Sequence, residues 1–232
     1  MASPGLSRRD RIVVAGETGD AVPLVRQVLA EVGPSYRPFG EARLIDAVVS
    51  GVRGLVPLEP FLWMETESPA DGASRGPRRR PEGRPEGRPE RRPDRGADVR
   101  WLDGQAEHEA GALFDLCFPH SHAQPGRAGV RRWAGVHDPA DGLLAVAADA
   151  WSGAGCGLLG GVVVHPRARG RGLGAAVSGY VVEALVRDYG RAALVVDADN
   201  VPAIAAYERI GMRGTLFGAA AVASGTADRP AG

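Results

Sequence analysis

The stretch that decides the fold runs from Cys156 to Val186 and reads CGLLGGVVVHPRARGRGLGAAVSGYVVEALV. Its first part, Leu158–Val164, is an apolar run that Pro166 stops, which predicts a buried strand. Its last part repeats apolar residues at four-residue spacing before Gly190, which predicts a helix with a glycine stop. The helical stripe consists of Leu173, Val177, Val181 and Leu185.

Between the strand and the helix lies a turn, RGRGLG, from Arg169 to Gly174. A glycine-rich turn that leads into a helix directs several backbone N–H groups and the positive end of the helix dipole at one spot. Such a spot suits a phosphate or pyrophosphate. The chain contains no lysine, since all 28 of its basic residues are arginine. The sequence therefore excludes a Walker-type phosphate lysine and a Schiff-base lysine.

The composition predicts a globular protein. The 232 residues are 44% hydrophobic, enough for one large domain or two small ones. The 28 basic and 28 acidic residues cancel, so no overall charge favours nucleic acid or an anionic membrane. The two cysteines, Cys117 and Cys156, lie in apolar segments, and we expect them to be free buried thiols. No apolar run approaches 18 residues, so we expect a soluble cytoplasmic protein that has no membrane partner.

Periodicity divides the chain into three parts. Residues 1–66 predict a small α/β unit with strands at Arg11–Gly16 and Phe61–Thr66, the second bounded by Pro60. Its two predicted helices are Ala21–Val32 and Glu41–Val52.

Residues 67–98 repeat a PEGR-like unit without apolar periodicity, which predicts a disordered linker. Acidic residues interleave with its arginines and it lacks aromatic residues, so we expect a solvated tether rather than a nucleic-acid-binding segment.

Residues 99–232 predict a single α/β unit on a mixed sheet. A helix, Gln105–Cys117, precedes a hairpin whose strands flank the turn DPADG. After the central strand and helix we expect a buried strand at Ala192–Asp199, and then a helix that Asn200 caps. A last strand is predicted over Met212–Val222.

This order of elements resembles the GNAT superfamily of N-acetyltransferases over residues 98–216. The acyl-CoA signature, Arg or Gln followed by x-x-G-x-G/A, matches Arg169, Gly172 and Gly174, and a second signature matches Asn200, Tyr207 and Gly211. The resemblance implies an α/β (α+β) GNAT fold, in which helices flank a mixed, mostly antiparallel sheet with a splayed parallel strand pair at the acyl-CoA site. The hairpin also resembles the C-terminal half of glycine N-acyltransferases, so residues 1–66 are expected to be a degenerate GNAT half.

The resemblance implies acetyl-CoA as cosubstrate, an amine acceptor, and no metal. By this resemblance, CoA pyrophosphate lies on the backbone of the turn, and the backbone N–H near Val164 polarises the thioester carbonyl. Asn200 is the expected pantetheine contact, and Tyr207 the expected acid for the leaving thiolate. The residues expected to form the turn site are Arg169, Gly170, Arg171, Gly172, Leu173 and Gly174.

The expected general base is less defined. The family often has a glutamate on the strand before the glycine turn, but Cys156–Val164 contains no carboxylate. The substitutes are Asp149, His120, His122 or a chain of water molecules. Arg131 and Arg132 are candidates for binding an acceptor carboxylate, and a solvated strand entry explains them equally well.

The leading hypothesis is an acetyl-CoA-dependent N-acetyltransferase that acts on a primary amine of a small molecule or an amino acid derivative. A non-catalytic acyl-CoA-binding regulatory module is the alternative, because the strand glutamate is missing. A nucleotide-binding Rossmann enzyme is disfavoured, since GRGLGAAV does not complete G-x-G-x-x-G. The motifs specify neither the acceptor amine nor an oligomeric state.

Overall fold

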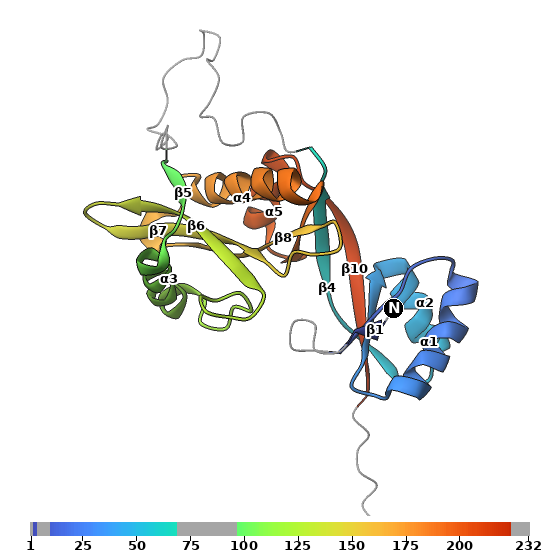
Figure 1. Ribbon diagram of the computed structural model, residues 1–232. Helices are drawn as coiled ribbons and strands as arrows, with labels where there is room; N and C mark the ends of the chain where they lie inside the picture. Colours follow the sequence, from blue (N-terminus) through green and yellow to red (C-terminus); the bar gives the residue numbers. More distant parts are fainter. Residues whose placement is uncertain (1, 4–9, 69–96, 224–232) are drawn as a thin grey trace, which may run out of the picture. The chain divides into compact units, whose positions relative to one another are not determined.

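The computed structural model describes residues 2–3, 10–68 and 97–223 (Figure 1). Most of the predicted linker, 67–98, therefore lies outside the described residues. The described chain packs as two compact units. Unit 1 comprises residues 2–3, 10–63, 197–199 and 215–223, and unit 2 comprises residues 64–68, 97–196 and 200–214. The sequence placed all of 99–232 in one domain, whereas residues 215–223 pack with unit 1.

Unit 1 is a small sheet covered by two helices. Strand β2 runs parallel to β3, and β10 runs antiparallel to β3. Helices α1 and α2 bury an apolar stripe against this sheet, with Val25, Ile45 and Val48 among the most buried side chains. The elements are β1 (Ala2–Ser3), β2 (Arg11–Val13), α1 (Thr18–Val32), β3 (Arg37–Glu41), α2 (Ala42–Gly51), β4 (Leu55–Thr66) and β10 (Arg213–Val222).

Two strands of unit 1 differ from the sequence prediction. Strand β3 was not predicted, because Pro38 and Gly40 are both poor strand formers. Gly40 is needed there, since a Cβ would collide with the Val14 carbonyl. Strand β4 begins at Leu55 rather than after Pro60, so proline does not bound it. A strand tolerates proline where the missing N–H is not required by the ladder, and Pro60 is exposed.

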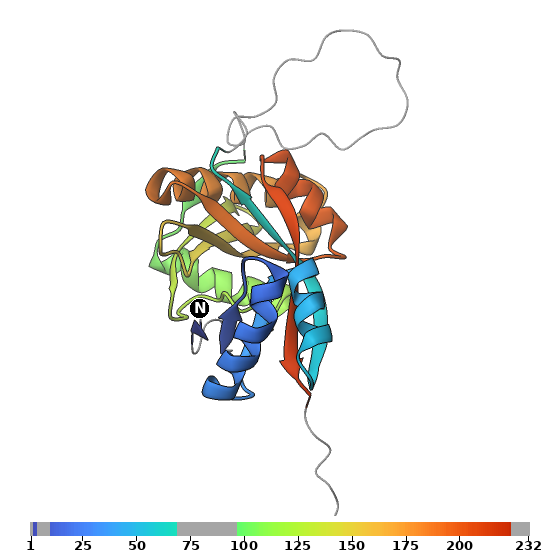
Figure 2. The same cartoon turned by 90° about the vertical axis from the view of Figure 1, so that its right-hand side faces the viewer.

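Unit 2 is a mixed sheet between two layers of helix. Its strand order is β9-β8-β7-β6-β5, with antiparallel pairs except for the parallel pair of β8 and β9. Helix α3 lies on one face of this sheet, and α4 and α5 lie on the other (Figures 1 and 2). The elements are β5 (Val99–Trp101), α3 (Gly104–Cys117), β6 (Val130–Asp138), β7 (Gly142–Ala150), β8 (Gly157–Val164), α4 (Leu173–Tyr189), β9 (Ala192–Asp197) and α5 (Val201–Arg209).

Helix α4 is buried along most of its sheet-facing side. The predicted stripe is confirmed, since Leu173, Val177, Val181 and Leu185 are each 2% exposed or less. Glycines in the left-handed conformation stand at both ends, with φ of 80° at Gly172 and 81° at Gly190. Glycine adopts these angles without steric cost, which explains why the helix begins and ends where it does.

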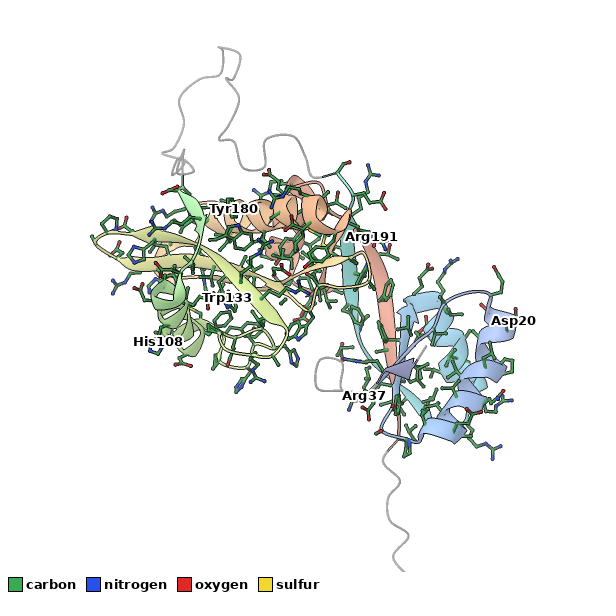
Figure 3. The ribbon with its side chains drawn as sticks, viewed as in Figure 1. Asp20, Arg37, His108, Trp133, Tyr180 and Arg191 are labelled. Atoms are coloured by element: carbon green, nitrogen blue, oxygen red, sulfur yellow. The ribbon has the colours of Figure 1, made fainter. Side chains whose placement is uncertain are left out.

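Strand β8 contains a bulge at the two consecutive glycines. The register with β7 passes from Val146↔Val163 to Ala148↔Gly160, so two residues of β8 face the single residue Ala147. Gly161 has φ of 59°, and a Cβ there would lie 2.6 Å from the Trp133 ring. Trp133 itself is 1% exposed and contacts Phe114 edge-on at a centroid distance of 5.2 Å. In Figure 3, Trp133 is labelled beside α3 and Tyr180 on α4. The bulge is therefore fixed by glycine and by a buried aromatic wall.

Strands β8 and β9 separate soon after they pair. Their register covers only Gly157↔Ala192 and Leu158↔Ala193, and residues 159–164 have no register with 194–196 in the described chain. Val195, in the unpaired part of β9, is 54% exposed. The predicted splayed parallel pair is thus present. No helix among the described residues has the length and apolar character needed to cross a membrane.

We predict that Gly161→Ala lowers the free energy of unfolding by about 2–4 kcal/mol, because the new methyl combines positive-φ strain with overpacking against Trp133. Gly142→Ala is the matched control, since Gly142 also has positive φ (73°) but open space around its Cβ position. Urea denaturation of both variants measures the difference. Equal losses of stability in the two variants would contradict the close packing at the bulge.

Candidate acyl-donor site

The glycine turn lies where β8 ends and α4 begins. A short 3-10 turn, Pro166–Ala168, follows β8, and its first N–H groups are organised by His165, whose Nδ1 accepts from Arg167 N at 3.2 Å. Gly170 and Gly172 then adopt φ of 76° and 80°. No side chain of the described residues caps the start of α4. The unbonded N–H groups of a first helical turn are therefore available to an anion at this position.

The start of α4 packs tightly against the end of β8. A Cβ at Gly174 would lie 3.3 Å from Val164 Cγ2, so glycine permits the close approach of helix and strand. Gly172 is required instead for its left-handed backbone. The two glycines of the predicted signature thus serve different purposes. Together they bring Val164 and the uncapped helix start to one place.

The turn is electropositive but not isolated. Arg169 is exposed, and Arg171 acts electrostatically on Asp138 at the tip of the β6–β7 hairpin. The backbone N–H groups of Ala140 and Asp141, and to a smaller degree Arg171, hold the pKa of Asp138 below its usual range. Asp138 therefore carries negative charge beside the turn at neutral pH. The sequence did not indicate this acidic neighbour, which comes from a separate hairpin.

Asn200 and Tyr207 belong to α5, which follows β9. The carboxyl ends of parallel strands lie at the same edge of a sheet, so α5 begins at the edge where the glycine turn lies. Asn200 Oδ1 accepts from Ala203 N at 3.3 Å, which confirms its predicted role as a helix cap. Its part in binding pantetheine stays a prediction.

Tyr207 is 8% exposed, and burial raises the pKa of its phenol to about 12. No hydrogen bond to its hydroxyl is seen among the described residues. The hydroxyl therefore remains protonated at physiological pH and can donate to a new partner. This state is the one that an acid or hydrogen-bond donor requires.

Asp149, a base candidate from the sequence, is part of a buried ion pair. Its carboxylate is 2% exposed, and Arg132 Nε lies 3.5 Å from Oδ2. The Ser152 hydroxyl donates to Oδ1, and Leu158 N donates to the same hydroxyl oxygen at 2.8 Å. Arg132 also pairs with Asp188 at 2.7 Å, on the last turn of α4. Asp149 therefore fastens the β7–β8 connection, and it lies opposite Leu159, far from Val164.

The two histidines that are base candidates lie in the loop between α3 and β6, residues 118–129. His120 and His122 are exposed, whereas Ser121 and Ala123 between and after them are buried. Ala123 contacts the bulge, because a Cβ at Gly161 would lie 3.1 Å from the Ala123 methyl. The structure thus brings the histidine loop to β8. The sequence analysis did not predict this contact, which joins residues far apart in the chain.

Arg131 and Arg132, the candidates for binding an acceptor carboxylate, each lie over an aromatic ring. The Arg132 guanidinium lies 4.0 Å from the Trp101 ring centroid, and Arg131 lies 5.8 Å from that of Tyr189.

Cys117 and Cys156 are free thiols, as predicted, but both are only partly buried. Burial raises the pKa of the Cys156 thiol, which lowers its reactivity. Within the described ranges, no three His, Cys, Asp or Glu side chains are grouped so as to hold a metal.

Comparisons with known proteins agree with this geometry. The family model described as acetyltransferase (GNAT) family matches residues 115–212. A putative GNAT-family acetyltransferase from Novosphingobium aromaticivorans superposes with a TM-score of 0.52 at 19% identity, over 93% of this chain and 88% of its own. A GCN5-related N-acetyltransferase from Kribbella flavida gives 0.56 at 16% identity, over 94% and 83%. No curated protein matches the sequence. The predicted GNAT fold is confirmed, whereas a special closeness to glycine N-acyltransferases is not shown.

We predict that Asp149→Asn lowers the free energy of unfolding by about 1–3 kcal/mol, because it leaves Arg132 with one carboxylate partner and weakens a buried network. Because Asp149 lies on β7 opposite Leu159, near the start of β8 and away from the glycine turn, acetyl-CoA affinity should remain within about twofold of wild type. Urea denaturation and calorimetric titration measure the two effects. Unchanged stability together with a large loss of turnover would instead favour Asp149 as a base.

Proposed function

We propose that this chain, which has the GNAT fold and matches the GNAT acetyltransferase family over residues 115–212, is an acetyl-CoA-dependent N-acetyltransferase. Its acceptor is a primary amine of a small molecule or an amino acid derivative. The single observation that carries the proposal is the splay of β8 from β9 beside an uncapped helix start. One strand edge and one anion site at the same sheet end suit a long thioester with a pyrophosphate.

The pyrophosphate is assigned to the turn Arg169–Gly174. Its left-handed glycines leave the backbone accessible, and the helix start supplies N–H donors and a favourable dipole. The side chains of Arg169 and Arg171 add positive charge, and Leu173 anchors the turn because it is only 2% exposed. Arginine pairs well with phosphate through its planar, multiply donating head.

The acyl group is assigned to the unpaired edge of β8. Within the part of the chain that the structure describes, residues 159–164 have no partner strand on the β9 side, so their backbone groups on that side can bond the pantetheine chain. A bulge leaves its extra residue unpaired in the ladder, so the backbone N–H of that residue is available to another partner. The bulge at Gly161 and the strand end at Val164 are therefore the places where an N–H would polarise a thioester carbonyl.

The reaction is a direct attack. The acceptor nitrogen adds to the thioester carbonyl carbon, a C–N bond forms, and the C–S bond then breaks. The amine loses protons to a base, and the leaving CoA thiolate takes one proton to become a thiol. Tyr207, protonated because burial raises its pKa to about 12, is proposed to donate to the sulfur.

Two finer assignments complete the proposal. The acceptor class follows the resemblance of the β6–β7 hairpin to the C-terminal half of glycine N-acyltransferases. The cytoplasmic location follows the two free thiols. The alternative function, a non-catalytic acyl-CoA-binding module, is favoured by one observation, namely that β8 carries no carboxylate. Tight acetyl-CoA binding without turnover over a broad panel of amines would select it.

We predict that Gly172→Ala weakens acetyl-CoA binding at least tenfold, because alanine disfavours φ of 80° and distorts the start of α4. Gly190→Ala is the matched control, since Gly190 has φ of 81° at the other end of the same helix. Both variants should lose similar stability, about 1 kcal/mol. Calorimetric titration distinguishes them, and equal acetyl-CoA affinity in the two variants would contradict the assigned pyrophosphate site.

We predict that Tyr207→Phe lowers kcat by about 100-fold with little change in acetyl-CoA affinity, because only the proton donor is removed. In the wild type, the phenol loses its proton only near pH 12, so it should produce no fall in rate below about pH 11. The raised pKa also favours the fold below about pH 10, a contribution that is lost as pH rises toward 12. Thiol release measured across pH checks the first two points. A rate that falls near pH 9 in the wild type but not in the variant would contradict them.

A further inference from the structure

The loop of residues 118–129 is packed directly onto the bulge of β8. The Ala123 methyl would lie 3.4 Å from a Cβ at Gly160 and 3.1 Å from one at Gly161, and Ala123 is only 2% exposed. A bulge places both glycines toward the same face of the sheet, which is the face that α3 covers. The loop therefore approaches β8 at the point where the backbone turns toward the splay.

Side-chain hydrogen bonds hold this loop in position. The buried Ser121 hydroxyl donates to the Ala123 carbonyl at 2.9 Å, and Gln124 Nε2 donates to the Pro119 carbonyl at 2.7 Å. At the far end, the Trp151 indole N–H donates to the Ala128 carbonyl at 3.1 Å. Since these bonds fix the backbone at separate points, the residues between them are presented in a defined place.

His122 is the ionisable side chain next to the contact. It lies between buried Ser121 and buried Ala123, and its own side chain is exposed. Consecutive Cα atoms are about 3.8 Å apart, so the imidazole begins one residue from the atoms that touch the bulge. No hydrogen bond to this imidazole is seen among the described residues, so its nitrogen atoms are open to a substrate.

Strand β8 has no room for a base of its own on this face. A side chain at Gly161 is excluded by positive φ and by the Trp133 ring, 2.6 Å from the Cβ position. Space at Gly160 is filled by Ala150 and Ala123 at 3.3 and 3.4 Å, and Val163 is apolar and 5% exposed. Packing therefore leaves no space for a carboxylate side chain on this face of β8 at the bulge. A proton acceptor on this face must come from another segment of the chain.

We propose that His122 accepts the proton of the acceptor amine beside the β8 bulge, an assignment that rests on the proposed function. The ammonium of the acceptor transfers one proton to neutral imidazole, which passes it to solvent. The free amine then attacks the thioester carbon, and the second N–H proton compensates the one that the CoA thiolate takes up. The sum is one amide, one CoA thiol and one proton released.

The charged surroundings of His122 are few. Its own loop contributes His120 and Arg127, and Asp115 lies near the end of α3. The residues packed against Ala123 at the bulge, Gly160, Gly161 and Trp133, have no ionisable side chain. Asp149 is paired with Arg132, and Arg132 also pairs with Asp188 of α4, the helix on the other face. A histidine acts as a base only in its neutral form. Turnover that depends on this imidazole should therefore fall at acidic pH.

The test compares His122→Gln with the control His108→Gln, an exposed histidine of α3, and includes His120→Gln because His120 is the rival candidate in the same loop. With acetyl-CoA and an amine that the wild type acetylates, thiol release is measured from pH 5.5 to 9. We expect His122→Gln to lose about 100-fold in kcat at pH 7 and to lose the rise with pH, with the acetyl-CoA Kd unchanged. The control His108→Gln should retain both the rate and its rise with pH. Added imidazole should restore part of the rate in His122→Gly but not in His122→Gln.

Each contrary result has a separate meaning. If His122→Gln keeps the wild-type kcat and pH profile, or if only His120→Gln loses them, the assignment of His122 is overturned and the proposed function stands. If His122→Gln also loses acetyl-CoA affinity, the loop acts on donor binding and the assignment is likewise overturned. If the wild type binds acetyl-CoA but acetylates no amine, the proposed function fails and the role of His122 fails with it.

Discussion

The contact between the Gly160–Gly161 bulge and Trp133 constrains much of unit 2. Two residues of β8 face one residue of β7 there, and the indole ring occupies the space that a side chain at Gly161 would need. Bulges bend a strand and increase its local twist. The same strand has already lost its register with β9 beyond Leu158. A small irregularity, fixed by a large buried ring, thus accompanies the opening to which we assign acyl-CoA binding.

The two faces of β8 contact different parts of unit 2. On one face, α4 brings its uncapped start against Val164 and offers backbone donors to an anion. On the other face, the loop of residues 118–129 brings His122 and closes over the glycines. A single strand therefore separates the side proposed for the donor from the side proposed for the acceptor. The chemistry would take place at the edge between them, where the strand has no paired partner among the described residues.

Sequence patterns predicted the elements that follow a simple period or a local signal. The α4 stripe, the Asn200 cap and the β6–β7 hairpin each depend on residues close together in the chain, and each is present. Tertiary features escaped prediction. The start of β4 was hidden by Pro57 and Pro60, and Asp149 looked like a free carboxylate until Arg132 and Ser152 were seen beside it. Local sequence patterns did not predict these features, because the features depend on contacts between residues that are far apart in the sequence.

Because β8 and β9 separate after their first two pairs, unit 2 has an unpaired strand edge between two strands of its sheet. Ordinary edge strands invite pairing with other chains, and proteins protect them with charge, proline or covering loops. Here residues 159–164 of β8 present unpaired backbone groups, but β9 continues beside them. A ligand that pairs with these groups in the folded state alone would stabilise the fold by mass action.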